Sequence, residues 1–188
     1  MTHSAERAGG GAPADAPLVI RACDGRDLDA LEEQIASPGR SRLHWARFAE
    51  QQSGESVYLI AWRGGEPVGH LNLRWYGSRS PSVATRLERC PEINALGVRP
   101  ELQNQGIGTA LVREAERLAA ERSYPRICLG VGIDNFGARR LYERLGYRYW
   151  SHGTIEGSWS YEDHDGRTVV QREEIVYMSK RLRRSVLR

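Results

Sequence analysis

The sequence has 188 residues, of which 40% are hydrophobic and 27% are charged, with a formal net charge of +3. This length provides one domain with a substantial core and is short for two ordinary domains. No apolar run approaches the roughly twenty residues that a membrane helix needs, and arginines scattered along the chain do not form a nucleic-acid-binding pattern.

Residues 1–16 contain no aromatic side chain and are rich in glycine, alanine and proline. Such a segment cannot bury enough surface to offset the entropy lost on ordering, so we expect a disordered arm, followed by one domain over residues 17–185. The arm also lacks the apolar core of a signal peptide, and Cys23, Cys90 and Cys128 have neither disulfide-framework nor metal-site spacing. We therefore expect a cytoplasmic protein with free thiols.

The first half of the domain is predicted to combine short helices with a hairpin. Apolar residues at helical or alternating spacing, separated by glycine and proline, define these elements. They are a strand at 18–21, a helix at 27–35 capped by Asp27, a helix at 44–52, strands at 58–62 and 68–75 joined at Gly64 and Gly65, and a loop at 77–90.

A strand, a glycine-rich turn and a helix follow. The strand begins at Glu92 and ends at Val98, because Pro100 has no N–H for a ladder, and the helix runs from near Gly106 to about Glu121. Unpaired N–H groups and the positive end of the helix dipole converge at such a turn and favour an anion. A Walker loop is excluded because no Gly-Lys-Ser/Thr is present, and the dinucleotide fingerprint lacks its third glycine.

The last third is predicted to hold a buried strand at 126–131, a helix capped by Asp134 or Asn135 and ended by Gly146, and strands at 147–150 and 169–177. A long polar loop at 153–168 joins the two strands. Aromatic faces and carboxylates in this loop suit a cationic amine. They are Glu156, Trp159, Tyr161, Glu162, Asp163 and Asp165, with His164 among them. One histidine between two acids is a weak ligand set, so we expect an exposed turn and no metal.

Two segments carry a family resemblance. Residues 103–108, Gln-Asn-Gln-Gly-Ile-Gly, resemble the Q/R-x-x-G-x-G/A pyrophosphate-binding motif of the GNAT superfamily of acyl-coenzyme A N-acyltransferases. Residues 135–147 resemble that superfamily's N-x-x-A-x-x-L-Y-x-x-x-G-F/Y segment. The resemblance covers nearly the whole chain after about Pro17. The alternative is an α/β domain whose glycines only permit turns.

The resemblance implies an α/β (α+β) fold: one mixed, mostly antiparallel twisted sheet flanked by about four helices and splayed at the strand ending in Val98. It implies acetyl-CoA as co-substrate. The residues that it places against the coenzyme are Leu96, Gly97, Val98, Gln103, Asn104, Gln105, Gly106, Ile107, Gly108, Thr109, Asn135, Phe136 and Ala138.

Catalytic roles are also implied for two side chains. Glu92 matches the general base of the protein-acetylating branch, acting directly or through water, and Tyr142 is suited to protonate the departing thiolate. The Val98 N–H is the expected oxyanion donor, exposed by a bulge at Gly97. The alternatives are a solvated strand end for Glu92 and an ordinary core aromatic for Tyr142.

The sequence thus predicts an N-acetyltransferase that acts on a small primary amine such as an antibiotic or metabolite, with no nucleic-acid or membrane partner. A protein N-terminal or lysine acetyltransferase and a non-catalytic acyl-CoA sensor are the competing hypotheses. The acceptor, the acyl chain and the pairing of subunits into a homodimer stay open.

Overall fold

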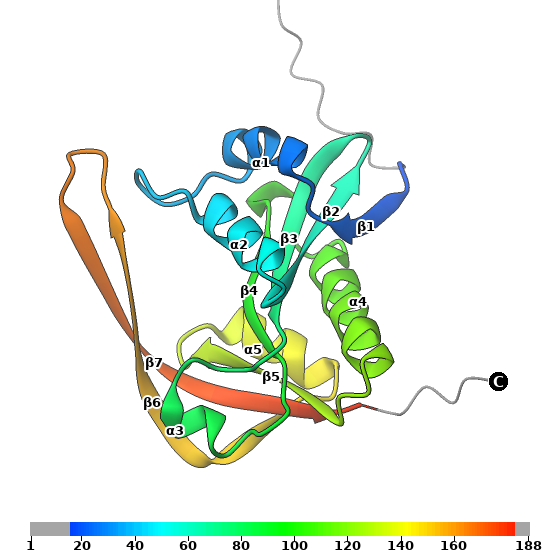
Figure 1. Ribbon diagram of the computed structural model, residues 1–188, viewed down its shortest axis with the longest axis vertical. Helices are drawn as coiled ribbons and strands as arrows, with labels where there is room; N and C mark the ends of the chain where they lie inside the picture. Colours follow the sequence, from blue (N-terminus) through cyan, green and yellow to red (C-terminus); the bar gives the residue numbers. More distant parts are fainter. Residues whose placement is uncertain (1–15, 183–188) are drawn as a thin grey trace, which may run out of the picture.

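The computed structural model describes residues 16–182, which form one seven-stranded sheet in the order β1-β2-β3-β4-β5-β7-β6 (Figure 1). All neighbouring strands are antiparallel except β4 and β5, which confirms the predicted mixed, mostly antiparallel sheet. The strands are β1 (Leu18–Ala22), β2 (Ser56–Arg63), β3 (Glu66–Arg74), β4 (Glu92–Val98), β5 (Arg126–Gly132), β6 (Arg148–Glu162) and β7 (Thr168–Arg181).

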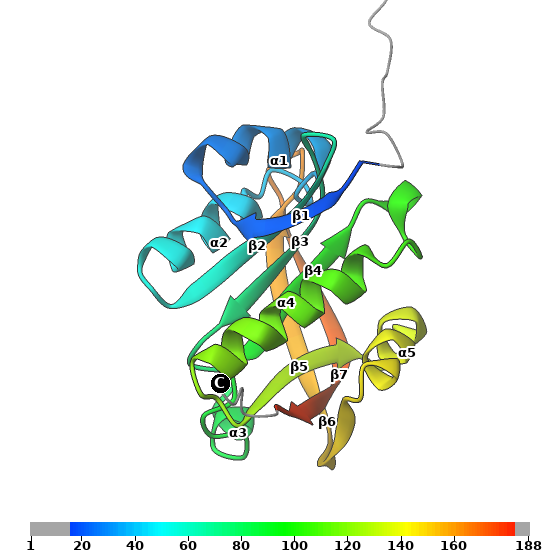
Figure 2. The same cartoon turned by 90° about the vertical axis from the view of Figure 1, so that its right-hand side faces the viewer.

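Helices cover both faces of the sheet (Figure 2). They are α1 (Leu28–Gln34), α2 (Leu43–Gln52), α3 (Pro81–Ala84), α4 (Ile107–Glu121) and α5 (Phe136–Arg144). The short α3 lies within the stretch predicted to be a loop, and it accounts for the helix beyond the four that were expected. The predicted arm lies, except for its last residue, outside the described residues, as do the last three residues of the predicted domain.

Alternation along β2 builds the two halves of the core. Leu59 and Ala61 pack in the cluster that includes Leu111 of α4, whereas Tyr58 and Ile60 point to the other face and pack against α1. Successive side chains of a strand point to opposite faces, so one strand anchors helices on both sides. Leu111 is fully buried, which contributes about 1.5–3 kcal/mol of hydrophobic stabilisation.

The sheet opens between β4 and β5. The two strands pair only through Glu92 with Cys128 and Ile93 with Leu129, and they diverge beyond this point. The predicted splay is therefore confirmed. The predicted bulge at Gly97 is wrong: the register between β3 and β4 shifts where Ile93 and Ala95 pair with consecutive residues of β3, which leaves Asn94 as the extra residue.

Helix termini follow the predicted glycine and asparagine signals with one exception. Gly106, at the start of α4, has φ 82° and Gly146, after α5, has φ 89°, both in the left-handed region that glycine tolerates. The Asn135 side chain caps α5 by accepting from the Ala138 N–H at 3.1 Å. The predicted cap by Asp27 is wrong, because Asp24 caps the short 3₁₀ turn that precedes α1.

The predicted loop at 153–168 is also wrong. Strands β6 and β7 remain paired from Thr154 to Glu162 on one side and from Thr168 to Val176 on the other, as a long hairpin that projects from the body (Figure 1). Alternation explains the difference, since Ile155, Trp159 and Tyr161 share one face of β6. Polar residues on the other face concealed this pattern in the sequence.

The remaining structural expectations concern the cysteines and the hairpin turn. All three cysteines are free, as predicted, and all three are buried. In the turn, Asp163 Oδ1 accepts from the backbone N–H groups of Asp165 and Arg167, which supports the reading as an exposed turn. Within residues 16–182, no helix is both long and apolar enough to cross a membrane.

Candidate active site

A cavity of about 590 Å³ lies at the N-terminus of α4, beside the diverged part of β4 and the start of α5. Its wall combines a helix terminus, polar side chains and an apolar surface. The lining residues are Leu96, Val98, Leu102, Gln103, Asn104, Gly106, Ile107, Gly108, Thr109, Asn135, Gly137, Ala138, Leu141 and Arg144. We refer to it as the coenzyme cavity.

The helix N-terminus makes this cavity suited to an anion. Asn104 and Gly106 both have positive φ, 62° and 82°, so the backbone turns sharply before α4 begins. A Cβ on Gly106 would meet no atom within 4 Å, so its conformation, not crowding, is what favours glycine. The first N–H groups of a fifteen-residue helix have no intrahelical partner, and they add to the helix dipole. A phosphate or pyrophosphate is the matching ligand.

Most of the predicted coenzyme residues line this cavity, and three do not. Gln105 turns its side chain to Arg63, whose Nη1 donates to Oε1 at 2.7 Å. Phe136 is 60% exposed. Gly97 lies against His70, where an added Cβ would be 2.5 Å from Nε2. Contacts of these three with a coenzyme stay predictions.

Four lining residues were missed in the sequence. They are Leu102, Gly137, Leu141 and Arg144. Spacing of three residues from the predicted Ala138 points to Leu141, and the same step from Leu141 points to Arg144, so that signal was present. Arg144 is the cation of the set, and no carboxylate within residues 16–182 forms an ion pair with it, so its charge is available to an anion.

A second cavity, of about 460 Å³, lies between α2, the start of β4 and the hairpin. We refer to it as the acceptor cavity, because Glu92, the base predicted from the sequence, lies in its wall. Its lining residues are Leu43, Arg47, Glu92, Ile93, Asn94, Gly130, Gly157, Ser158, Trp159, Ser160, Glu173, Ile175 and Tyr177. Of the aromatic and acidic residues in the predicted loop, only Trp159 is among them. The carboxylates that suggested a cationic acceptor therefore lie elsewhere on the hairpin.

Glu92 is buried in the wall of the acceptor cavity, with 4% of its surface exposed. The alternative of a solvated strand end is therefore wrong. Burial raises the pKa of Glu92, against the opposing effects of the Tyr177 hydroxyl, which donates to Oε1 at 2.6 Å, and of Arg74, whose Nη1 lies 4.0 Å from Oε2. The Ser78 hydroxyl lies 2.8 Å from the Tyr177 hydroxyl. A carboxylate with a raised pKa suits a general base.

Tyr142 lies on α5 next to Leu141 of the cavity wall, in the core cluster, and is 5% exposed. Its ring meets Tyr147 edge to face with centroids 5.6 Å apart, and burial raises its pKa. The hydroxyl is not part of the cavity wall, and the packing is that of a core aromatic. Its role as proton donor stays a prediction, as does the role of the Val98 N–H.

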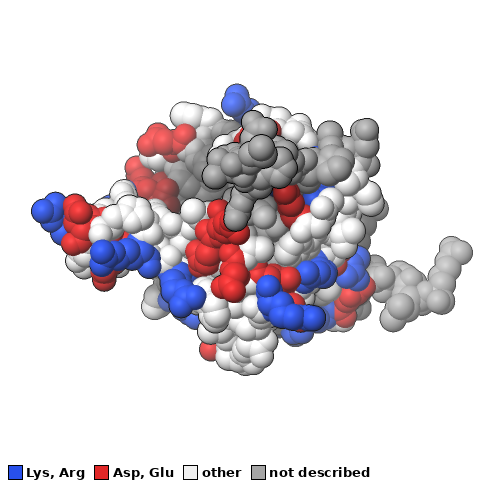
Figure 3. All heavy atoms as spheres, turned by 90° about the horizontal axis from the view of Figure 1, so that it is seen from above, with Lys and Arg blue, Asp and Glu red and all other residues white. Residues whose placement is uncertain are grey.

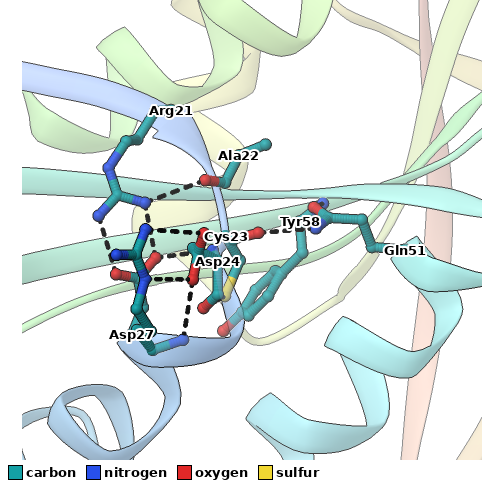
Figure 4. A network of polar contacts seen from close by, with 8 residues as sticks. Arg21, Ala22, Cys23, Asp24, Asp27, Gln51 and Tyr58 are labelled. Atoms are coloured by element: carbon teal, nitrogen blue, oxygen red, sulfur yellow. Dashed lines mark hydrogen bonds and ion pairs between the residues drawn. The ribbon is translucent and has the colours of Figure 1, made fainter.

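The position of α2 is fixed by polar contacts with the first two strands (Figure 4). Gln51 donates from Nε2 to the Cys23 carbonyl at 2.8 Å and accepts the Tyr58 N–H at 2.9 Å. Nearby, Arg21 forms a bidentate pair with Asp27 at 2.6 and 2.8 Å. The two contacts of Gln51 hold α2, whose Leu43 and Arg47 line the acceptor cavity.

The tip of the hairpin is joined to the loop between α1 and α2. The Arg40 N–H donates to the Glu162 carbonyl at 2.7 Å, and the Arg40 guanidinium lies 3.7 Å from the Glu162 carboxylate. Gly39, with φ 59°, permits this approach because an added Cβ would be 2.1 Å from the same carbonyl oxygen.

In the view of Figure 3, charges of both signs are interspersed over the surface, without a broad field of one sign.

The chain belongs to the GNAT acetyltransferase family. The family model described as "Acetyltransferase (GNAT) family" matches residues 26–147, which include both cavity-forming helices α4 and α5. The match includes strands β2 to β5 and ends at residue 147, before the hairpin of β6 and β7. The family is therefore established over the coenzyme side of the molecule.

Individual relatives agree with this assignment. A mycothiol acetyltransferase of Acidothermus cellulolyticus is 35% identical over 109 residues, which are 55% of this chain and 33% of that protein. The chain spans less than half of the length of the curated relatives it matches.

Solved structures show the same fold. An N-acetyltransferase of Staphylococcus aureus Mu50 has a TM-score of 0.64 at 16% identity, covering 89% of this chain and 100% of that one. The ribosomal-protein-S18-alanine N-acetyltransferase of Escherichia coli has a TM-score of 0.60 at 21% identity, with coverage of 92% and 99%.

Proposed function

We propose that this protein transfers an acetyl group from acetyl-CoA to the primary amine of a small molecule. The observation that carries the proposal is the arrangement of the two cavities along β4. Leu96 and Val98 line the coenzyme cavity, whereas Glu92 and Asn94 line the acceptor cavity, so one strand separates a site for an anionic coenzyme from a buried base.

The coenzyme cavity fits the chemistry of coenzyme A. The N-terminus of α4 matches the pyrophosphate, and Arg144 supplies a fixed positive charge for a further phosphate. Leu96, Val98 and Leu141 provide an apolar surface suited to the pantetheine arm. Bound there, the coenzyme supplies the activated acetyl group as a thioester.

Three groups of the protein have separate roles in acyl transfer. Glu92 accepts a proton from the amine, directly or through water, as the nitrogen attacks the thioester carbon. The Val98 N–H stabilises the negative charge on the carbonyl oxygen. Tyr142, the donor that the sequence predicts, must reach the coenzyme cavity from the core beside Leu141 to donate a proton to the thiolate as the carbon–sulfur bond breaks. The products are the acetylated amine and the free thiol of coenzyme A.

The contact between Arg40 and Glu162 favours a small acceptor over a polypeptide. It joins the loop before α2 to the hairpin tip, so an extended chain could not pass between these two segments while the contact is in place. A protein N-terminal or lysine acetyltransferase is the second candidate, supported by the position of Glu92. A sensor without turnover is the third. The cytoplasmic location and the pairing of subunits stay predictions from the sequence.

The test is mass spectrometry of an amine and peptide panel incubated with acetyl-CoA and the full chain. Glu92→Gln and Tyr142→Phe should each reduce the rate by about a hundredfold or more. Glu156→Gln is the matched control, because Glu156 lies on the hairpin outside the acceptor cavity. Acetylation of peptides without small amines would establish the second candidate. Coenzyme binding without any product would establish the sensor.

A further inference from the structure

Among the described residues, Arg47 of α2 is the one cation that lines the acceptor cavity. Within residues 16–182, no carboxylate lies within ion-pair distance of its guanidinium. Arg74, by contrast, is paired with Glu50 at 2.9 Å and lies 4.0 Å from Glu92. The two arginines therefore differ in their partners. Arg74 is paired with carboxylates and holds Glu92 in place, whereas the Arg47 guanidinium is available to a bound anion.

The surroundings of Arg47 supply no internal counter-ion. Its guanidinium lies 6.0 Å from the centroid of the Tyr58 ring, next to the buried side chains of His44 and His70. Burial lowers the pKa of both histidines and raises that of Tyr58, and the charge of Arg47 acts on all three groups. These groups are therefore neutral near pH 7. Glu32 of α1 acts on His44 and Tyr58, but it forms no ion pair with Arg47.

A half-buried guanidinium beside neutral aromatic groups is a binding site for an oxyanion. Taking a charge partly out of water is costly unless it is paired, and arginine offers a planar fork that matches a carboxylate or phosphate. The other charged residues of the cavity wall, Glu92 and Glu173, cannot serve such a ligand, because both are acidic. The base and the cation come from different elements, β4 and α2.

We infer that Arg47 binds an oxyanion of the acceptor, so that the acceptor is a zwitterion of the amino-acid kind, with its amine directed to Glu92 and its carboxylate to Arg47. This inference rests on the proposed function and narrows its substrate class. It also replaces the cationic acceptor predicted from the polar hairpin, whose carboxylates mostly lie outside the cavity. A carboxylate fits the planar guanidinium best, and a phosphate-bearing amine shares the same chemistry.

The experiment compares matched acceptors. The proteinogenic amino acids are offered with acetyl-CoA to the full chain, and the best of them is then compared with its amide, its decarboxylated amine and its phosphonate analogue. The native protein should prefer the two oxyanion-bearing acceptors by about ten- to a hundredfold in kcat/KM. Their ranking distinguishes a carboxylate from a phosphate source.

Arg47→Gln should remove this preference. The KM for the amino acid should rise about ten- to a hundredfold with little change in kcat, whereas the values for the decarboxylated amine should stay constant. Arg47→Lys should restore part of the difference. Arg42→Gln is the matched control, since Arg42 stacks on Trp45 and does not line the cavity. Far-ultraviolet circular dichroism and thermal unfolding verify that each variant is folded.

Equal acetylation of the amino acid and its decarboxylated amine by the native protein would overturn the inference while leaving the proposed function intact. So would an Arg47→Gln variant that affects all acceptors alike. If no acceptor is acetylated, the anion site can still be tested by measuring ligand binding. Calorimetry with an N-acetyl amino acid and its amide should show a preference for the acid that Arg47→Gln abolishes, and its absence in the native protein would refute the anion site.

Discussion

Replacing Tyr177 with phenylalanine tests whether Glu92 is the base. The substitution removes a single oxygen, and with it the hydrogen bond that Tyr177 donates to Glu92 Oε1 at 2.6 Å. A neutral donor to a carboxylate stabilises the ionised form, so its loss raises the pKa of Glu92 further above its ordinary value. Arg74 stays in place, 4.0 Å from Oε2.

The size of the effect follows from the burial of the carboxylate. A hydrogen bond to a charged group contributes about 1.5–3 kcal/mol, and Glu92 is 4% exposed, so solvent screens little of it. Because one pH unit corresponds to about 1.4 kcal/mol, the acidic limb of the profile should move upward by about one to two pH units. The variant should lose activity most at low pH and recover it as the pH rises.

The assay is the pH dependence of kcat/KM for acetyl transfer with the native protein and Tyr177→Phe. Tyr149→Phe is a matched control, because the Tyr149 hydroxyl also donates to a carboxylate, Glu143, at 2.5 Å, on the exposed surface of α5. An unchanged limb, a downward shift, or the same shift in Tyr149→Phe would refute the assignment of Glu92 as the base that governs this limb.

Three further predictions concern other parts of the molecule. Gly97→Ala should lower the free energy of unfolding by about 1–3 kcal/mol in urea titration, because its Cβ would lie 2.5 Å from His70 Nε2, and His70→Ala in the same chain should recover part of this loss. Arg144→Gln should raise the KM for acetyl-CoA about tenfold, whereas Arg140→Gln, which lies outside the cavity, should not. Asp27→Asn should cost about 1–3 kcal/mol at pH 7. Burial alone would raise the pKa of Asp27, but the bonds from Arg21 and the Asp24 N–H lower it overall. This stabilisation is present above the unfolded pKa of about 3.9 and is lost as the pH falls through the folded value, so the stabilities of native protein and variant should converge in acid.

The coenzyme side was predictable because its determinants are local. The turn before α4 depends on Gly106, whose φ of 82° is a property of one residue, and the cap of α5 depends on Asn135 and a backbone group three residues later. Helical periodicity then fixed the extent of α4. Most residues of the sequence motifs therefore line the cavity, and Arg144 could have been added from its spacing of three residues to Leu141.

The acceptor side was not predictable because it depends on register and on distant segments. Arg47, Gly130, Trp159 and Tyr177 line one cavity from four different elements, and nothing local in the sequence brings them together. The hairpin shows the same limit: its strands are stabilised mainly by cross-strand pairing, which a polar outer face conceals. The bulge near Asn94 likewise depends on how β4 aligns with β3.

The geometry of β4 connects these two sides. Its first two residues pair with β5, and the acceptor cavity lies beside this paired part, so Glu92 is held in a rigid ladder. The later residues of β4 do not pair with β5, and the coenzyme cavity lies beside them. Its helices, α4 and α5, pack on the face of the sheet opposite to α2. The base therefore belongs to the sheet, whereas the inferred anion contact belongs to α2. Substitution of Arg47 on α2 should therefore change which amine is chosen without changing how its proton is removed, whereas substitution of Glu50, on the same helix, would disturb Arg74 beside Glu92.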